Sequence, residues 1–182
     1  MFARTKRLTL RPAWPEDAER LATAIGHEAV ATMLSRVPFP YDVADARAFI
    51  AAPRGIHDIA WLIFTHDGGY PALVGGVGLW ASGDAHEIGY WLTPDAWGRG
   101  YATEAARAVV ETARDALPID RVVARHRLDN PASARVLHKL GFRPTGRIEA
   151  FASVADATAV DAAVVELMLR DDERTPSMPL AA

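Results

Sequence analysis

A strand-like run, a glycine turn and a long amphipathic helix follow one another between residues 86 and 116. The run HEIGYWL, at 86–92, is apolar and aromatic and predicts a strand. WGRGYAT comes next, and a helix predicted from Gly100 to Ala116 buries one stripe of small apolar residues: Ala102, Ala105, Ala106, Val109, Val110 and Ala113. The other stripe is charged and is predicted to face solvent: Glu104, Arg107, Glu111 and Arg114. Together with the elements described next, this order predicts a mixed α/β domain.

The rest of the chain adds strands and helices, without an internal repeat. Apolar runs, alternating or continuous, predict strands at 6–13, 59–66, 71–80, 120–127 and 164–170, the second and third as a hairpin. Helical spacing predicts helices at 16–26, 27–36, 42–52 and 130–141, with Asp42 and Asn130 as caps. Residues 37–41 and 151–160 are expected to be irregular. We therefore expect one domain over residues 1–170 and a disordered tail over 171–182.

Composition argues against several kinds of function. The net charge of −3 argues against a general nucleic-acid binder, and no run reaches the ~20 apolar residues of a membrane span. The chain has no cysteine, which rules out disulfides, thiolate metal sites and a cysteine nucleophile. Its six histidines lack metal-ligand spacing, so we expect no metal. A start without the apolar core of a signal peptide favours a soluble cytoplasmic protein.

The glycine turn is a candidate anion site. Gly98, Gly100 and Ala102 keep side-chain bulk low where a helix begins, and the N–H groups from Gly98 to Thr103 would point into one concavity, with Arg99 adding charge. A plain tight turn is the alternative. The dinucleotide-binding pattern fails because position 103 is threonine, and the Gly-Lys-Ser/Thr of a P-loop is absent from the sequence.

Two longer segments decide the interpretation. HEIGYWLTPDAWGRGYATEAARAVVETA and VVARHRLDNPASARVLHKLGF together resemble the GNAT superfamily of acetyl-CoA-dependent N-acetyltransferases. RLTLRP and VPFPYDVADARAFI resemble the branch of the ribosomal-protein N-terminal alanine acetyltransferases, so the likeness covers about residues 4–170. It implies a single α/β (α+β) domain whose mixed, mostly antiparallel sheet is flanked by helices and splayed between 86–92 and 120–127. It also implies acetyl-CoA as cosubstrate.

The resemblance assigns donor-binding residues by their places in these motifs. The turn from Trp97 through Gly98, Arg99, Gly100 and Tyr101 to Ala102 corresponds to the pyrophosphate cradle, with Trp97 where the family has Gln or Arg. The main chain of Tyr90, Trp91 and Leu92 is implied to bind pantetheine, and the Leu92 N–H is a candidate to polarise the thioester carbonyl. Asn130 matches the asparagine of the later motif, and Ser133 lies one helical turn beyond it.

Proton transfer requires a base and an acid. Glu87 is the candidate base, since the resemblance often places a carboxylate at this point of the strand and alternation puts it on one face with Gly89 and Trp91. The alternative for Glu87 is an ion pair with an arginine. The family's usual tyrosine donor is Leu137 here, so Ser133 is the candidate acid, ahead of Tyr101; a reaction without an acid also stays open.

These residues predict acetyl transfer from acetyl-CoA to a primary amine, on a protein N-terminus or a small molecule, by direct attack in a ternary complex. A noncatalytic acyl-CoA-binding sensor or interaction module is one alternative, and a nucleotide-binding protein that uses the same glycine turn is another. No nucleic-acid or membrane partner is expected. A homodimer formed through a strand edge is left open.

Overall fold

An eight-stranded sheet runs through the computed structural model, which describes residues 1–156 and 159–170. In chain order its strands are β1 (Ala3–Arg4), β2 (Leu8–Pro12), β3 (Ile59–Thr65), β4 (Ala72–Ser82), β5 (Ala85–Leu92), β6 (Arg121–Arg127), β7 (Arg143–Ala152) and β8 (Ala159–Met168). Their order across the sheet is β1-β2-β3-β4-β5-β6-β8-β7. Neighbours are antiparallel except for β5 and β6, which confirms the predicted sheet. The tail predicted at 171–182 lies outside the described residues.

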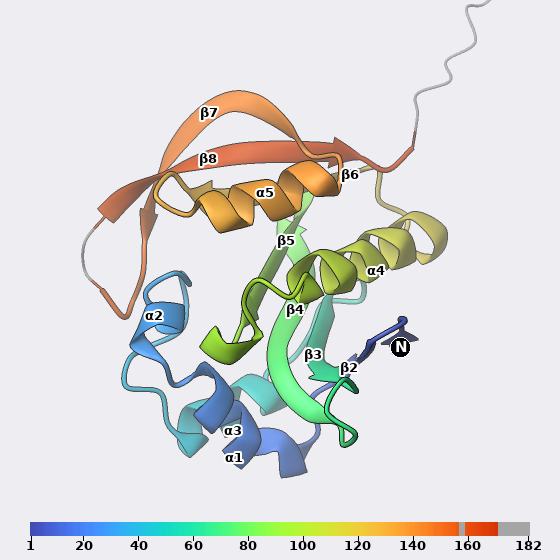
Figure 1. The fold of residues 1–182 in the computed structure, drawn as a ribbon. Coiled ribbons are helices and arrows are strands. Elements are labelled where there is room, and N and C mark those ends of the chain that lie inside the picture. Colours follow the sequence, from blue (N-terminus) through green and yellow to red (C-terminus); the bar gives the residue numbers. More distant parts are fainter. Residues whose placement is uncertain (157–158, 171–182) are drawn as a thin grey trace, which may run out of the picture.

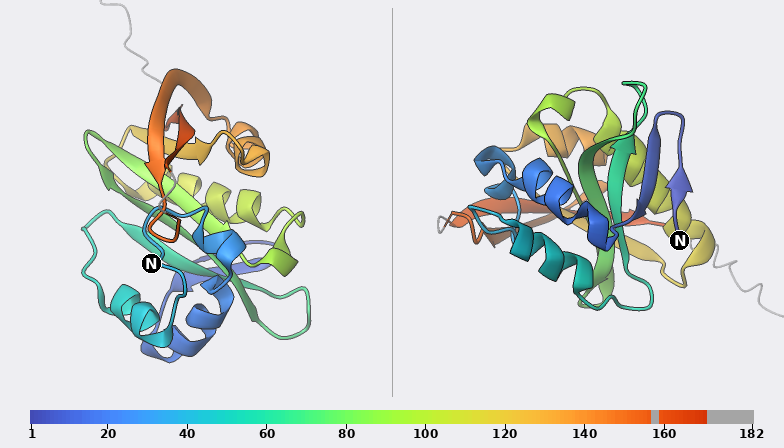
Figure 2. Two further views of the ribbon diagram at one scale, coloured as in Figure 1. Left: turned by 90° about the vertical axis from the view of Figure 1, so that its left-hand side faces the viewer. Right: turned by 90° about the horizontal axis from the view of Figure 1, so that it is seen from below.

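Helices cover both faces of the sheet (Figures 1 and 2). They are α1 (Ala18–Ile25), α2 (Glu28–Ala31), α3 (Val43–Ala51), α4 (Tyr101–Ala116) and α5 (Pro131–Lys139), with the 3₁₀ turns η1 (Pro15–Asp17) and η2 (Pro94–Ala96). Alternation along β3 serves both layers: Leu62 and Phe64 pack with α1 and α3, while Ile63 packs with α4 and α5. The fold therefore has an α1–α3 face and an α4–α5 face.

The sheet opens between β5 and β6. These parallel strands pair at two positions, His86 with Val122 and Glu87 with Val123. Within the described residues no further pair joins them, although β5 runs on to Leu92 and β6 to Arg127. The predicted splay is thus confirmed, and the later half of β5 has a free edge inside the sheet.

Local sequence signals placed several helix ends correctly. Asp42 caps α3 by accepting from the N–H groups of Ala44 and Asp45. Asn130 caps α5, and Pro131 is its first residue, as predicted. The cap of α4 is Gly100. Helix ends are therefore predicted well from neighbouring residues, namely a short polar cap, a glycine or a proline at a fixed place.

Tertiary contacts shorten one of the predicted helices. The helix predicted at 27–36 ends at Ala31, because the next turns bind the far end of the sheet instead. The Ser153 hydroxyl donates to the carbonyls of Ala31 and Leu34, and the Arg127 guanidinium donates to that of Thr32. These three carbonyls are used outside the helix.

Strand β7 was missed by the sequence analysis. Most of its side chains are exposed at the sheet edge, so it has no apolar alternation to detect. Gly146, at a φ of +81°, lies where the pairing of β7 with β8 shifts register. Of the segment 151–160, expected to be irregular, residues 153–156 are irregular, but 151–152 end β7 and 159–160 begin β8.

The predicted solvent stripe of α4 also needs a correction. Arg107, Glu111 and Arg114 are exposed, but Glu104 is half-buried against the turn between β1 and β2. Helical periodicity describes one helix and carries no information on a neighbour that covers its outer side.

A buried ion pair fixes the N-terminal helices to β2. Arg11 donates to both oxygens of Asp17, Nη1 to Oδ2 at 2.6 Å and Nη2 to Oδ1 at 2.9 Å, and the Trp14 N–H donates at 2.8 Å. Burial alone would raise the pKa of Asp17, but these hydrogen bonds lower it below its ordinary value of 3.8. The folded chain therefore stabilises the ionised form of Asp17 relative to its protonated form.

We expect Asp17 to make stability depend on pH. Because its pKa is lower in the folded chain, its contribution is present above pH 3.8 and is lost as the pH falls through the lowered value. Asp17→Asn should cost about 1–3 kcal/mol at pH 7 and flatten the acid limb of a plot of unfolding free energy against pH. Denaturant unfolding between about pH 2 and 7 measures this, with the exposed Asp115→Asn as control. An unaltered acid limb in Asp17→Asn would contradict the prediction.

Candidate active site

Backbone conformation explains the two glycines of the turn between β5 and α4. Gly98 has a φ of +74° and Gly100 a φ of +81°, a region that side chains disfavour. A Cβ on Gly98 would meet nothing within 4 Å, and one on Gly100 would approach Nη2 of Arg7 at 3.5 Å, an ordinary contact. Conformation rather than crowding therefore requires glycine, and the space beside Gly98 is open to a ligand.

The start of α4 presents unused hydrogen-bond donors. No side chain caps the helix at Gly100. Within the described part of the chain, the N–H groups from Gly98 to Thr103 donate no hydrogen bond. A helix of 16 residues also carries partial positive charge at this end, and Arg99 adds a full charge. These groups fit a pyrophosphate.

The free edge of β5 leads to this turn. The Trp91 carbonyl faces β4, since a Cβ on Gly75 would lie 2.2 Å from it. Main-chain groups alternate along an antiparallel pair, so those of Tyr90 and Leu92 face the gap. The Trp97 indole N–H donates to the Leu92 carbonyl at 2.9 Å. Of the three strand residues predicted to bind pantetheine, two thus direct their main chain to the gap, and Trp91 does not.

Tyr90 also joins the gap to the start of α5. Its hydroxyl lies 2.9 Å from the Ser133 hydroxyl and donates to the Ser133 carbonyl at 3.2 Å. Asn130 Oδ1 accepts from the Ser133 N–H at 3.0 Å. Burial raises the pKa of Tyr90 to about 12, against the opposing effect of its hydrogen bond to Ser133, so the phenol keeps its proton at neutral pH. The sequence analysis used only the main chain of Tyr90, although alternation places its side chain on the face opposite Glu87.

Glu87 lies on the other face, in an ion pair. Arg125 donates to both of its oxygens, Nε to Oε1 at 2.9 Å and Nη2 to Oε2 at 2.7 Å. Glu149 lies 3.7 Å from the same guanidinium and is paired with Arg147. The hydrogen bond to Glu87 is the main cause that raises the pKa of Arg125. This is the arrangement left open as the alternative to a base, yet each carboxylate oxygen keeps a further lone pair.

An aromatic wall stands beside Glu87. Trp80 is its partner across the β4–β5 register. The indole lies over two glycines, since a Cβ on Gly89 would be 2.6 Å from it and one on Gly78 3.3 Å. The Arg36 guanidinium lies 5.1 Å from the ring centre, and the indole N–H is buried with no hydrogen-bond partner among the described residues. Glycines facing a tryptophan across two strands were the signal that the sequence analysis did not use.

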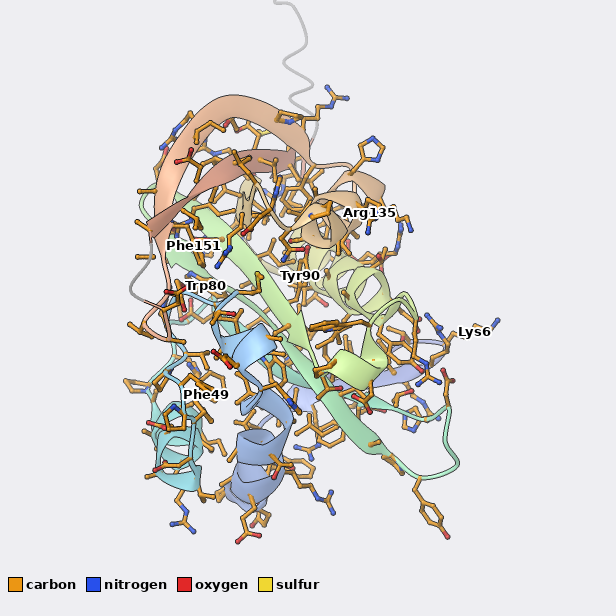
Figure 3. All side chains as sticks on the ribbon, turned by 60° about the vertical axis from the view of Figure 1, so that its left-hand side comes forward. Lys6, Phe49, Trp80, Tyr90, Arg135 and Phe151 are labelled. Carbon is orange, nitrogen blue, oxygen red and sulfur yellow. The ribbon has the colours of Figure 1, made fainter. Side chains whose placement is uncertain are left out.

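The structure thus distributes the predicted residues over two faces of one gap. Glu87 and Trp80 lie on the α1–α3 face, and Tyr90 and Ser133 on the α4–α5 face. In Figure 3 Tyr90 is labelled near the centre of the view and Trp80 to its left. An acceptor on the first face and a donor on the second would meet where β5 and β6 separate.

Comparison with known proteins agrees with this geometry. The family model described as acetyltransferase (GNAT) domain matches residues 7–143, which is well over half of the chain. The chain belongs to the GNAT acetyltransferase family. Like the relatives with which it aligns, this GNAT protein is an N-acetyltransferase. One of them, the uncharacterized N-acetyltransferase YoaA of Bacillus subtilis (strain 168), is 30% identical over 148 residues, covering 78% of this chain and 82% of its own.

Solved GNAT structures share the fold. RimL, a ribosomal L7/L12 alpha-N-protein acetyltransferase solved with coenzyme A, superposes with a TM-score of 0.78 at 20% identity, over 92% of this chain and 98% of its own. A spermidine N-acetyltransferase from Vibrio cholerae, solved with CoA and spermine, gives 0.73 at 15% identity, over 91% and 97%. At these identities the likeness concerns the fold alone.

Other features of the described residues add little to the site. Two surface cavities, of about 340 and 590 Å³, are not lined by any predicted site residue. Across 1–156 and 159–170, no cluster of three His, Asp or Glu side chains is arranged to hold a metal ion. In the same residues no helix has the length and apolar character to cross a membrane. The gap and the glycine turn, rather than a closed cavity, define the candidate site.

Proposed function

We propose that this GNAT protein binds acetyl-CoA along the free edge of β5 and acetylates a primary amine by direct attack in a ternary complex. The observation that carries the proposal is the continuity between that edge and the N–H groups at the start of α4. Acetyl-CoA, when bound, supplies an acetyl group on a thioester. Relatives solved with coenzyme A support this choice of donor.

Main-chain groups do most of the donor binding in this proposal. The N–H groups from Gly98 to Thr103 hold the pyrophosphate, with Arg99 adding charge. Tyr90 and Leu92 offer their gap-facing main chain to the pantetheine amides. The Leu92 N–H is directed to the thioester carbonyl, where a donor is worth about 3 kcal/mol once negative charge develops.

Two side chains handle protons, one on each face. Glu87 takes the proton of the attacking amine, directly or through a water, by way of the lone pairs that Arg125 leaves free. As the C–N bond forms and the C–S bond breaks, Ser133 gives a proton to the sulfur and takes one back from solvent. Tyr90 orients the Ser133 hydroxyl through their 2.9 Å contact.

The acceptor is a primary amine on a protein N-terminus or a small molecule. Two fold neighbours are named for these two kinds of acceptor, a ribosomal protein and spermidine. We favour the protein N-terminus because RLTLRP and VPFPYDVADARAFI resemble the ribosomal-protein branch. Trp80 with Arg36 also offers a wall for a peptide chain. We place the reaction in the cytoplasm, which a chain without cysteine suits.

Calorimetry tests the donor first. We expect acetyl-CoA and CoA to bind, while ATP and NAD bind at least about tenfold more weakly because they lack a pantetheine arm for β5. Thiol release is then measured with spermidine, with a peptide that has a free N-terminus and, as matched control, with the same peptide already acetylated. A folded protein that binds neither CoA nor acetyl-CoA would overturn the proposal.

A further inference from the structure

Arg7, in the turn between β1 and β2, connects the start of α4 with the glycine turn. Its Nη1 donates to the carbonyl of Arg99 at 2.9 Å. Its Nε and Nη2 reach Oε2 of Glu104 at 2.8 and 2.7 Å, and its own N–H donates to Oε1 at 2.9 Å. The guanidinium also lies 4.8 Å from the ring centre of the fully buried Tyr101. One side chain therefore bonds both the helix and the turn.

The bond to Arg99 fixes more than one carbonyl. A trans peptide unit is planar, so its C=O and its N–H point in opposite directions. The carbonyl of Arg99 belongs to the same peptide unit as the N–H of Gly100. Gly100 has a φ of +81°, and a glycine has little conformational preference of its own that would hold this unit in one orientation. By bonding the Arg99 carbonyl, Arg7 holds that carbonyl toward β1 and β2 and the Gly100 N–H away from them.

We infer that Arg7 and Glu104 are positioning residues for the donor, holding the Arg99–Gly100 peptide so that its N–H rather than its carbonyl faces the coenzyme pyrophosphate. Neither side chain needs to touch the ligand. The inference rests on the proposed function, since it concerns the same cradle. A flipped unit would present a carbonyl oxygen to the phosphates, which repels them.

The anchor of Arg7 is itself well held. Glu104 accepts from the Thr5 hydroxyl at 2.6 Å in addition to its bonds with Arg7. Burial would raise the pKa of Glu104, but the hydrogen bonds from Thr5 and Arg7 lower it below its ordinary value, so it is ionised at neutral pH. The negative charge of Glu104 lies close to the proposed anion site, where by itself it would repel a phosphate. A carboxylate at this position therefore needs another role, such as holding Arg7.

The direction in which Glu104→Gln changes the Kd for CoA distinguishes two roles of Glu104. If Glu104 acted only through its charge, removing that charge would strengthen CoA binding. As the anchor of Arg7 it should do the reverse, and we expect the Kd for CoA to rise about 10- to 100-fold, the worth of one hydrogen bond to a charged group. Glu111→Gln, two turns farther along the same helix and exposed, is the matched control and should leave the Kd within about twofold.

Arg7 is tested with two substitutions. Arg7→Met should raise the Kd for CoA by a similar factor. Arg7→Lys should rescue little, because an ammonium lacks the planar fork by which the guanidinium bonds the Arg99 carbonyl and, through Nε and Nη2, Oε2 of Glu104 at once. Lys6→Met removes a neighbouring exposed charge and serves as control (Figure 3). Pantetheine lacks the pyrophosphate, so in an NMR titration it should bind the wild type and the Arg7 and Glu104 variants equally. A variant that had lost its fold would not bind pantetheine like the wild type.

The outcomes separate the two proposals. A wild type that does not bind CoA overturns the proposed function. A wild type that binds CoA, with Glu104→Gln binding equally or more tightly, overturns the positioning role and leaves the proposed function standing. Equal losses for CoA and pantetheine also overturn it, since the defect would then lie outside the cradle. Weaker CoA binding with unchanged pantetheine binding supports it.

Discussion

Gly100→Asp should reduce the affinity for CoA by about 100-fold or more while leaving the protein folded. The new carboxylate stands at the N-cap of α4, where its charge opposes the pyrophosphate and its oxygens bind the same N–H groups. Aspartate is among the residues that tolerate a positive φ best, and its Cβ would meet Arg7 only at 3.5 Å. Calorimetric titration with CoA measures the loss, and circular dichroism checks the fold.

Gly100→Asn is the matched control for this change. It has the same shape and the same φ requirement without the charge, so it should lose clearly less affinity than the aspartate variant. Equal losses in both variants would show that backbone conformation alone is responsible. Full CoA affinity in Gly100→Asp would remove the cradle from the proposed site.

Glu87→Gln should lower kcat by about 10²- to 10⁴-fold, the usual contribution of a general base. The amide keeps the size of the carboxylate but cannot accept a proton at neutral pH. If Glu87 is the base, the pH–rate profile of the remaining activity should also differ from that of the wild type. Steady-state kinetics between pH 5 and 9 with saturating acetyl-CoA measures both quantities.

Arg125→Gln distinguishes the base from the ion pair. It breaks the same pair but leaves the Glu87 carboxylate in place, so it should lose much less kcat than Glu87→Gln does. Matching losses and matching profiles in the two variants would assign Glu87 to the ion pair alone. An unchanged kcat and profile in Glu87→Gln would eliminate it as the base.

Local chemistry explains what the sequence predicted well. The glycine turn, the cap at Asn130 and the stripe of alanines on α4 are each determined by residues a few positions apart. The family motifs then placed the gap beside β5, and strand alternation put Glu87 on one face with Trp91. None of these steps needs a contact between distant segments.

What the sequence missed depends on distant partners. Glu87 and Arg125 meet because β6 lies beside the start of β5, and Glu104 is covered because Arg7 folds over α4. Charged residues such as these fit a solvent stripe or an ion pair equally well until the neighbouring element is known. The contact between Tyr90 and Ser133 is of the same kind, since it joins a strand to a helix that follows after another strand.

The separation of β5 from β6 also bears on association between copies of the chain. Free strand edges usually invite a strand from another chain, which leads to aggregation. Here the free edge of β5 is flanked on both sides, by β4 and by β6, within one sheet. A strand from another copy would have to enter between β5 and β6, which are still paired at Glu87 and Val123. The free main-chain groups of β5 therefore lie inside the sheet, whereas β1 and β7 form its two outer edges.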